Sequence, residues 1–233
     1  ARSSLILFKM ESPLSLVAGG TGLVGSYIIS SLSKKSGTQL ILARSFDADV
    51  PHNAELRIIN FDDLKLKKIK LESKIDNVYL CLGKRLATYE LLYMQDSSRE
   101  SFKIIDFDYP LSIAKLAFDA GAKNIAVVSA VGAQEGSSNY YFHIKGKLEE
   151  EIKKIGYKNI VIAQPGHLLG ERNEFRGYEI PILEFGLSVA HPLMRGPLKN
   201  FRQIEAKKVA AAMVANNERY SDSGVIRYLT YGD

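Results

Sequence analysis

Three residues near the middle of the chain have side chains whose chemistry is complementary. Ser129 ends an apolar segment, and Tyr141 and Lys145 follow it, four residues apart. On a helix that spacing puts the tyrosine and the lysine on one face. A nearby ammonium favours the phenolate, and an acidified tyrosine can protonate a carbonyl oxygen that gains charge. We therefore predict a catalytic set of Ser129, Tyr141 and Lys145, with the serine hydroxyl orienting the substrate oxygen; an ordinary surface pair is the alternative for the tyrosine and the lysine.

A glycine-rich turn near the start of the chain indicates a binding site for a dinucleotide. Gly19, Gly22 and Gly25 recur at spacing three, between the apolar run 14–18 and a helical pattern. Such a turn lets bare backbone N–H groups approach a diphosphate, and the helix start adds the positive end of its dipole. The pattern predicts a dinucleotide site formed by Gly19, Thr21, Gly22, Leu23, Val24 and Gly25, although glycine turns also arise for purely steric reasons.

The ends of other apolar runs extend this site. Arg44 and Ser45 follow the run 39–43, where a dinucleotide fold meets the adenosine ribose, and an arginine there favours the 2′-phosphate of NADP(H) over NAD. A surface arginine, with Asp47 or Asp49 at the ribose, is the alternative. Asp62 could approach the adenine amino group or cap the next segment. The remaining predicted cofactor residues are Cys81, Leu82, Gly83, Lys145, Pro165 and Gly166.

The chain alternates between apolar runs and helical patterns, which predicts how these residues come together. The pattern is typical of an α/β fold with a doubly wound parallel sheet, the Rossmann fold, in a single domain. Strands are expected at 14–18, 39–43, 55–61, 76–83, 124–129 and 159–164, with a closing edge strand at 225–229. Helices are expected after the glycine turn, at 64–74, at 97–120 with a kink or new turn at Pro110, from residue 141, and at 205–216.

The rest of the chain divides around this domain. Residues 1–13 are expected to form an N-terminal extension and residues 14–233 the NAD(P)-binding domain. Within it, about 166–202 break into Gly, Pro and aromatic residues, which predicts the wall or lid of a substrate pocket.

Composition narrows the class of protein. With 233 residues, 46% hydrophobic and 24% charged, the chain can bury one substantial core. The single cysteine fits a reducing compartment, so we expect a cytoplasmic protein without a cysteine-rich metal site. Near His143 and His167 no spacing of Asp, Glu or Cys indicates a metal site. The net charge of +5 is spread over several segments, so no nucleic acid is expected, and no apolar run reaches the roughly 20 residues that span a membrane. The oligomeric state and the substrate are not determined.

Taken together, these motifs resemble the short-chain dehydrogenase/reductase superfamily. The resemblance is carried by the glycine turn, Ser129, Tyr141-x-x-x-Lys145 and Pro165-Gly166, and is greatest to the atypical NmrA-like members, in the Tat-interacting-protein oxidoreductase-like branch. It implies NADP(H) binding, with Tyr141 as acid/base, Lys145 as ribose anchor and Ser129 as substrate orienter. Two positions depart from the usual pattern: Asp106 stands where many members have asparagine, and Gln164 where related chains often have arginine.

The function predicted from residues and resemblance is an NADP(H)-dependent oxidoreductase. It would transfer hydride between nicotinamide and a small carbonyl or hydroxyl substrate. A non-catalytic NADP(H)-binding redox sensor or regulatory interaction protein is the alternative, because such proteins can retain the same motifs.

Overall fold

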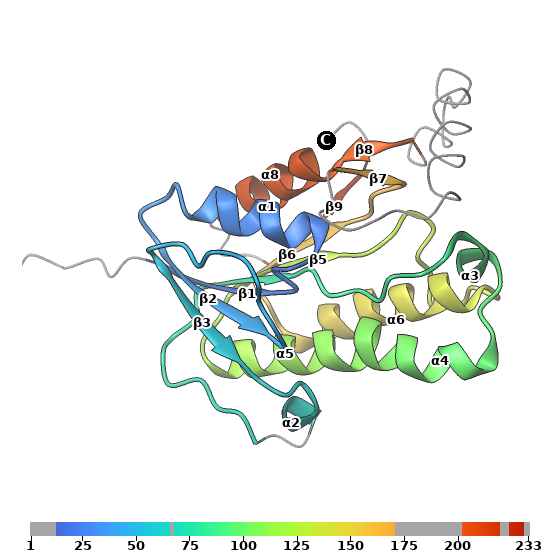
Figure 1. The fold of residues 1–233 in the computed structure, drawn as a ribbon, viewed down its shortest axis with the longest axis horizontal. Coiled ribbons are helices and arrows are strands. Elements are labelled where there is room, and N and C mark those ends of the chain that lie inside the picture. The colour runs from blue at the N-terminus through green and yellow to red at the C-terminus, as the bar shows by residue number, and fades with distance from the viewer. Residues whose placement is uncertain (1–12, 66–67, 171–201, 220–223, 231–233) are drawn as a thin grey trace, which may run out of the picture.

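The computed structural model describes residues 13–65, 68–170, 202–219 and 224–230. Its centre is a seven-stranded sheet in which every neighbouring pair of strands is parallel (Figure 1). From edge to edge the strands are β3 (Ala54–Ile58), β2 (Thr38–Ala43), β1 (Leu14–Ala18), β4 (Asn77–Leu80), β5 (Asn124–Val128), β6 (Asn159–Ala163) and β9 (Val225–Leu229). The predicted Rossmann fold is confirmed, including the edge strand at 225–229.

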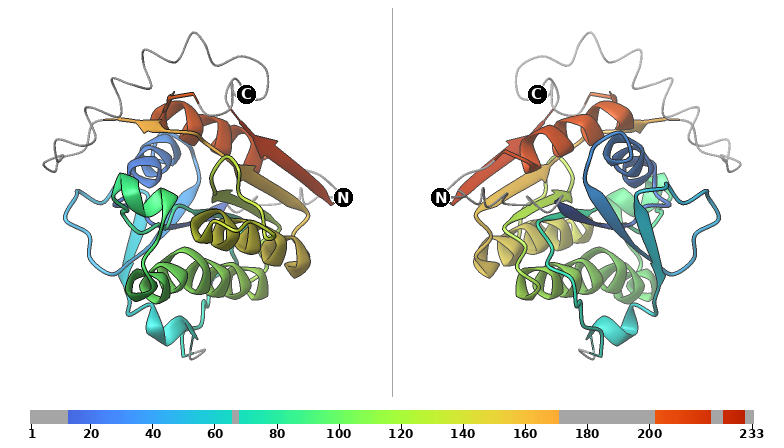
Figure 2. Two further views of the ribbon diagram at one scale, coloured as in Figure 1. Left: turned by 90° about the vertical axis from the view of Figure 1, so that its right-hand side faces the viewer. Right: turned by 90° about the vertical axis from the view of Figure 1, so that its left-hand side faces the viewer.

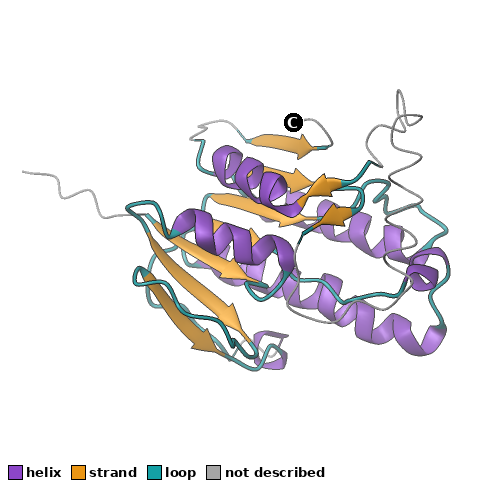
Figure 3. Ribbon diagram, turned by 45° about the horizontal axis from the view of Figure 1, so that its top comes forward, coloured by secondary structure: helices purple, strands orange, loops and turns teal. Residues whose placement is uncertain are grey.

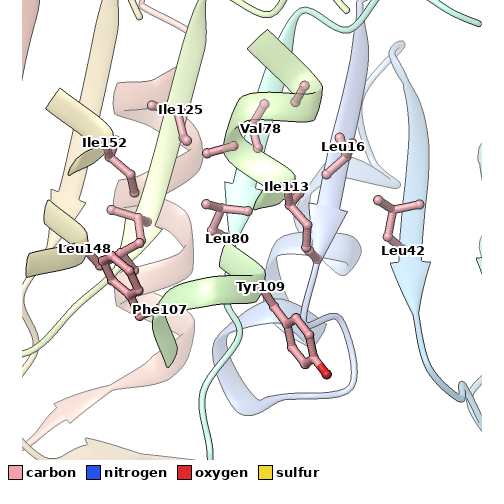
Figure 4. Packing of buried hydrophobic residues seen from close by; sticks show 14 of the residues in the cluster. Leu16, Leu42, Val78, Leu80, Phe107, Tyr109, Ile113, Ile125, Leu148 and Ile152 are labelled. Carbon is pink, nitrogen blue, oxygen red and sulfur yellow. The ribbon is translucent and has the colours of Figure 1, made fainter. Parts of the chain in front are cut away.

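Helices cover both faces of the sheet (Figure 2). On one face lie α1 (Leu23–Leu32) and α8 (Ala206–Asn217), and on the other lie α5 (Tyr109–Asp119) and α6 (Tyr140–Ile155) (Figure 3). Apart from polar residues near their N-terminal ends, the inner strands are apolar and buried on both sides, as is typical of parallel strands between two helical layers, whereas the edge strands β3 and β9 are partly exposed. Two buried cores result, and Figure 4 shows part of the larger one, where side chains of α5 and α6 lie against those of the strands.

The long helical segment before β5 contains a π-helical turn. It runs through α4 (Asp96–Lys103), the π-helix η1 (Ile104–Asp108) and α5, so the prediction of one helix at 97–120 interrupted near Pro110 is close to what forms. In a regular α-helix the N–H of residue 110 would bond to the carbonyl of residue 106, and Pro110 has no N–H. The wider turn accommodates the proline in the first turn of α5, with the N–H of Tyr109 donating to the carbonyl of Ile104.

The helix predicted at 64–74 is wrong. The structure has the short α2 (Asp62–Lys65), and the described residues 68–74 are not helical. Leu64 is buried, while Ile69 and Leu71 pack against the same core. Because Ile69 and Leu71 are two residues apart, an extended chain puts both on the core side, and this packing outweighs the helical pattern of the lysines.

Four of the predicted strands end earlier than expected, whereas the strands at 14–18 and 225–229 form as predicted and β2 begins one residue earlier. The strands expected at 55–61 and 76–83 end at Ile58 and Leu80, and Ser129 lies immediately after β5. One short helix, α3 (Thr88–Leu92), was not predicted.

A row of polar side chains crosses the sheet near the N-terminal ends of five strands. In register along the row are Gln39, Ser15, Asn77, Asn124 and Asn159. At one end, Nε2 of Gln39 donates to the carbonyl of Ile29 in α1, and at the other, Nδ2 of Asn159 donates to the carbonyls of Asn216 and Asn217 at 3.0 and 2.9 Å. Helices that run antiparallel to the strands end at this edge with unpaired carbonyls. Gln39 and Asn159 of this row therefore donate to carbonyls near the C-terminal ends of α1 and α8, and the carbonyl of Ile29 also accepts from the N–H of Ser33 at 2.9 Å.

The predicted substrate segment is described only at its two ends. Strand β7 (Leu168–Leu169) pairs in parallel with β8 (Ile204–Glu205), which brings residues 166–170 next to 202–205. The intervening residues 171–201, and residues 1–12 of the predicted N-terminal extension, lie outside the described part of the chain.

Candidate active site

The glycine turn lies at the point where the strand order reverses. From β1 the chain continues to β2 and β3 on one side, and β4 opens the other side, so the ends of β1 and β4 border a crevice of the kind in which open α/β folds bind ligands. Gly19 has φ +85°, and a Cβ there would lie 2.5 Å from the backbone carbonyl of Cys81. A Cβ on Gly25 would lie 2.2 Å from the carbonyl oxygen of Gly19. Both glycines are required by close backbone approach.

The start of α1 has the features of an anion site. Gly22 is the N-cap, no side chain caps the helix, and the first turn contains no acidic residue. The N–H groups of the first turn therefore have no side-chain acceptor, and with the dipole they suit a diphosphate. The residues present fit the predicted dinucleotide. The side chain of Leu23 also contacts the start of the predicted pocket wall. A Cβ on Gly170 would lie 2.6 Å from this side chain, so the chain at Gly170 passes close to the glycine turn.

Three residues lie near the end of β2, where the sequence predicts the adenosine end of the cofactor. Arg44 is exposed immediately after β2, and Asp62 opens α2. The hydroxyl of Tyr109 donates to Oδ1 of Asp62 at 2.8 Å. Burial raises the pKa of Tyr109, the hydrogen bond to Asp62 adds to the rise, and the charge of Arg44 opposes it. Asp62 therefore contacts Tyr109, a residue of this corner that the sequence motifs did not identify.

The other predicted cofactor residues differ in what they can offer a ligand. Thr21, Ser45 and Gly83 are exposed, whereas the side chains of Val24 and Pro165 are buried, which leaves their backbone groups as the candidates for contact. The carbonyl of Pro165 accepts from the N–H of Val131 at 3.1 Å. The thiol of Cys81 packs against the core under α1 and α8, and burial raises its pKa to about 12. Leu82 and Gly166 are half-buried.

The loop after β4 connects the glycine turn to the predicted catalytic helix. Its first residues, Cys81 and Leu82, lie against Gly19. Next along the loop, a Cβ on Gly83 would lie 3.4 Å from Oδ1 of Asp106, and the N–H of Lys84 donates to Oδ2 of Asp106 at 2.7 Å. Asp106 in turn forms an ion pair with Lys145 on α6. Four consecutive loop residues thus run from the predicted diphosphate site to Asp106, which is paired with Lys145, the predicted ribose anchor.

Helix α6 holds Tyr141 and Lys145 in a defined position. Its N-cap is Asn139, whose Oδ1 accepts from the N–H groups of Tyr141 and Phe142 at 2.9 and 3.3 Å. The same amide donates to the carbonyl of Leu91 at 2.8 Å, which attaches α3 to the start of α6. Farther along, a Cβ on Gly146 would lie 2.3 Å from the backbone of Gln134, so a glycine next to Lys145 lets the preceding loop pack on the helix.

The electrostatics around Tyr141 combine burial with two opposite charges. Nζ of Lys145 lies 2.8 Å from Oδ1 of Asp106, and their side chains are 6% and 2% exposed. Burial raises the pKa of Tyr141, Lys145 opposes that rise, and Asp106 adds to it, so the net pKa is raised. For Lys145, burial lowers the pKa, but Asp106, Tyr141 and Glu149 outweigh burial and the net pKa is raised. The expected acidification of the tyrosine by the lysine is present as a contribution, and it does not dominate.

The hydroxyl of Ser129 is engaged with a residue that was not predicted. Ser129 is buried, and its Oγ donates to Oε1 of Glu149 on α6. Nε2 of Gln164 donates to both oxygens of the same carboxylate, at 2.9 and 3.2 Å. Burial raises the pKa of Glu149, and these hydrogen bonds only partly reverse the rise. Because a serine has one hydroxyl hydrogen, Ser129 in this arrangement presents acceptor lone pairs to other partners.

Besides Tyr109, Glu149 is a site residue that motif reasoning missed, and Asp106 and Gln164 were noted without a predicted role. Asp106 and Gln164 stood out as departures from the superfamily pattern, and each bonds to a buried charge on α6. For Glu149 the signal was its position four residues after Lys145 and eight after Tyr141, which puts the three on one stripe of the helix.

The parallel fold, the glycine turn at its switch point and the tyrosine and lysine on α6 define a short-chain dehydrogenase/reductase-type protein. Solved structures agree on the fold: a UDP-glucose 4-epimerase from Thermotoga maritima superposes with TM-score 0.67, 12% identity and coverage of 93% of this chain and 76% of the other. A short-chain dehydrogenase/reductase family protein does so with TM-score 0.64, 16% identity and coverage of 94% and 96%.

Curated relatives identify the branch, although no family model matches the chain. Protein FMP52, mitochondrial, of Candida albicans is 30% identical over 199 residues, which cover 83% of this chain and 84% of the relative. The chain belongs to the FMP52 family, within the short-chain dehydrogenase/reductase superfamily of NAD(P)-dependent oxidoreductases. Protein HTATIP2 of Rattus norvegicus is 25% identical over 72% of this chain and 68% of its own length.

The relatives correct the predicted location. The FMP52 proteins of several fungi are named as mitochondrial, which contradicts the expected cytoplasmic location. A single cysteine fits any reducing compartment, so it could not distinguish the two. Among the described helices, none is both long and apolar enough to cross a membrane. Within the same part of the chain, no group of three or more His, Cys, Asp and Glu side chains could hold a metal ion.

Proposed function

We propose that this chain is an NADP(H)-dependent reductase that acts on a small carbonyl compound. The observation that carries the proposal is the continuous contact from Gly19 through residues 81–84 and Asp106 to Lys145. It joins a backbone cradle suited to a diphosphate to a helix bearing a phenol and an ammonium. The membership of the FMP52 family supports the same chemistry, and the names of its fungal members support a mitochondrial location.

Each group has a distinct role in this proposal. The turn at Gly19 to Gly25 and the start of α1 would hold the diphosphate, Arg44 the 2′-phosphate, and Lys145 the nicotinamide ribose. A reduced nicotinamide cofactor, when bound, would supply hydride for the carbonyl carbon. Tyr141 would give its phenolic proton to the carbonyl oxygen, so that the carbonyl becomes an alcohol, and would regain a proton from water. Ser129 would accept a hydrogen bond from a hydroxyl of the substrate or product.

Replacement of Tyr141 tests the proposal. With a panel of small aldehydes and ketones, the Tyr141→Phe variant should lower turnover at least about a hundredfold, the usual contribution of a positioned acid. Its affinity for NADPH, measured by cofactor fluorescence, should change little. Tyr140→Phe is the matched control, since the Tyr140 hydroxyl makes a long 3.4 Å hydrogen bond to the carbonyl of Arg99, and it should keep full turnover.

Two other outcomes would overturn the proposal. Unchanged turnover in Tyr141→Phe would exclude the tyrosine as proton donor. Tight NADPH binding by the wild-type chain without turnover of any carbonyl would instead favour the redox-sensor alternative, whose further requirement is a partner whose affinity changes with the cofactor's oxidation state.

A further inference from the structure

The carboxylate of Asp106 is bound from two sides by other elements. Its Oδ2 accepts from the backbone N–H of Lys84 at 2.7 Å, and its Oδ1 lies 2.8 Å from Nζ of Lys145. With both oxygens accepting and 2% of the side chain exposed, the group is arranged as a carboxylate paired with an ammonium. Asp106 lies in the η1 turn that accommodates Pro110, and π-turns within helices are frequent at functional sites.

Other charged groups near α6 have partners of their own. On α4 and η1, Nζ of Lys103 lies 3.4 Å from Oδ1 of Asp108. In the loop after β4, Nζ of Lys84 donates to Oγ of Ser101 at 2.9 Å. On α6 itself, Glu149 accepts from Ser129 and Gln164. The ionic contributions to Tyr141 come from Lys145 and Asp106, which act in opposite directions.

We propose that Asp106 is a positioning residue that orients the Lys145 ammonium and compensates its charge, so that Tyr141 stays a protonated phenol up to alkaline pH. An uncompensated ammonium would stabilise the phenolate, whereas a close ion pair in a buried site has little net charge to do so. The inference rests on the proposed function for its meaning, since a protonated phenol is the form that donates to a carbonyl oxygen. It explains why aspartate occupies a position where asparagine is common in the superfamily.

Direct titration of the tyrosine tests this without substrate or cofactor. In protein labelled with ¹³C at the tyrosine ζ carbon, Tyr141→Phe assigns the resonance of Tyr141. In the wild-type chain that resonance should keep its neutral shift to about pH 10 or above, the ordinary limit for a tyrosine. In Asp106→Asn, which is nearly isosteric, it should titrate at least about one pH unit lower, because the Lys145 charge is no longer compensated.

Matched variants keep the result interpretable. Asp108→Asn makes the same charge change two residues away and should leave Tyr141 unchanged. If Asp106→Asn does not fold, the double variant Asp106→Asn/Lys145→Gln removes both charges and should leave the tyrosine within about half a pH unit of wild type. The proposal would be overturned if Tyr141 titrated at the same pH in the wild type and in Asp106→Asn. It would also be overturned if the titration midpoint of Tyr141 rose by about one pH unit or more in the double variant.

A pH profile separates this inference from the proposed function. If carbonyl reduction is found, the fall of kcat/KM at high pH should move down in Asp106→Asn by the same interval as the tyrosine resonance. If no substrate is found, the resonance alone still decides the role of Asp106.

Discussion

Nζ of Lys145 lies 2.8 Å from Oδ1 of Asp106, and the two side chains are almost completely shielded from solvent. The contact joins the middle of α6 to a π-helical turn on the preceding helical segment. A buried pair of this kind adds little net stability over apolar residues, but the loss of one partner leaves an uncompensated buried charge.

Removal of that partner should therefore be strongly destabilising. We expect Asp106→Ala to lower the free energy of unfolding by about 3–5 kcal/mol, as measured by urea denaturation followed by circular dichroism. Asp96→Ala is the control, because its partner Arg99 lies on the surface and such pairs contribute at most about 1 kcal/mol. Similar losses of unfolding free energy in the two variants would show that the buried pair contributes no more to stability than the surface pair.

Glu149 should make stability depend on pH with a sign opposite to that of an ordinary salt-bridged carboxylate. Burial raises its pKa in the folded chain, so the folded state binds a proton more tightly than the unfolded state. The protonated folded form is favoured below the unfolded pKa of about 4.3, and stability falls as pH rises from there through the folded pKa.

Glu149→Gln should remove this dependence. As pH rises through the same interval, the unfolding free energy of the variant minus that of the wild type should increase and then level off. Urea denaturation at several pH values measures it, with Glu150→Gln as the neighbouring control. A difference between variant and wild type that does not change with pH would contradict the prediction.

The close packing of Gly25 in α1 against the turn at Gly19 should leave no room for a side chain at position 25. In Gly25→Ala, the new Cβ would lie 2.2 Å from the carbonyl oxygen of Gly19, so the turn must open. We expect a destabilisation of about 1–3 kcal/mol, typical of overpacking, and at least a tenfold loss of NADPH affinity, equal to about 1.4 kcal/mol. Thermal unfolding with and without NADPH measures both. Gly136→Ala, where no atom lies within 4 Å of the new Cβ, should behave like wild type, and equal NADPH binding by the two variants would exclude the turn as the diphosphate site.

Arg44 should determine the choice between the two nicotinamide cofactors. Arg44→Asp should weaken NADPH binding at least about tenfold and leave NADH binding unchanged or improved, because an acid at this position can accept from a ribose hydroxyl and repels a phosphate. Fluorescence titration with each cofactor gives the ratio of the two dissociation constants. Lys34→Glu, just beyond the far end of α1, controls for the change of net charge, and an equal loss of both cofactors in Arg44→Asp would refute the assignment.

The polar row across the sheet should contribute to folding at the edge opposite the site. Asn159→Ala would remove the donor to the carbonyls of Asn216 and Asn217 and the acceptor of Arg227. We expect a loss of about 2 kcal/mol or more, since each unsatisfied buried group costs about 1–3 kcal/mol. Urea denaturation of Asn216→Ala, whose side chain donates to the carbonyl of Ala212 within its own helix at 2.9 Å, gives the reference, and an equal loss there would contradict this account.

The agreement between sequence and structure is greatest where the signal is local. The glycine spacing, the apolar runs and the i, i+4 pair on α6 each depend on residues within a few positions of one another, and backbone sterics and side-chain periodicity act at that range. The extended segment at 68–74 was missed for the opposite reason, since packing of Ile69 and Leu71 against a distant core decided its conformation.

Read alone, the chain specifies a parallel sheet, a glycine turn after its first strand and a tyrosine and lysine one turn apart, because these follow from local pattern. Only the folded molecule shows that Asp106 pairs with Lys145 and that Glu149 accepts a hydrogen bond from Ser129. It also shows that the loop after β4 contacts both the glycine turn and Asp106. These partners are 39, 20 and 22 residues apart in sequence. Their meeting depends on how the helices pack on the sheet, which carries no local signature in the sequence.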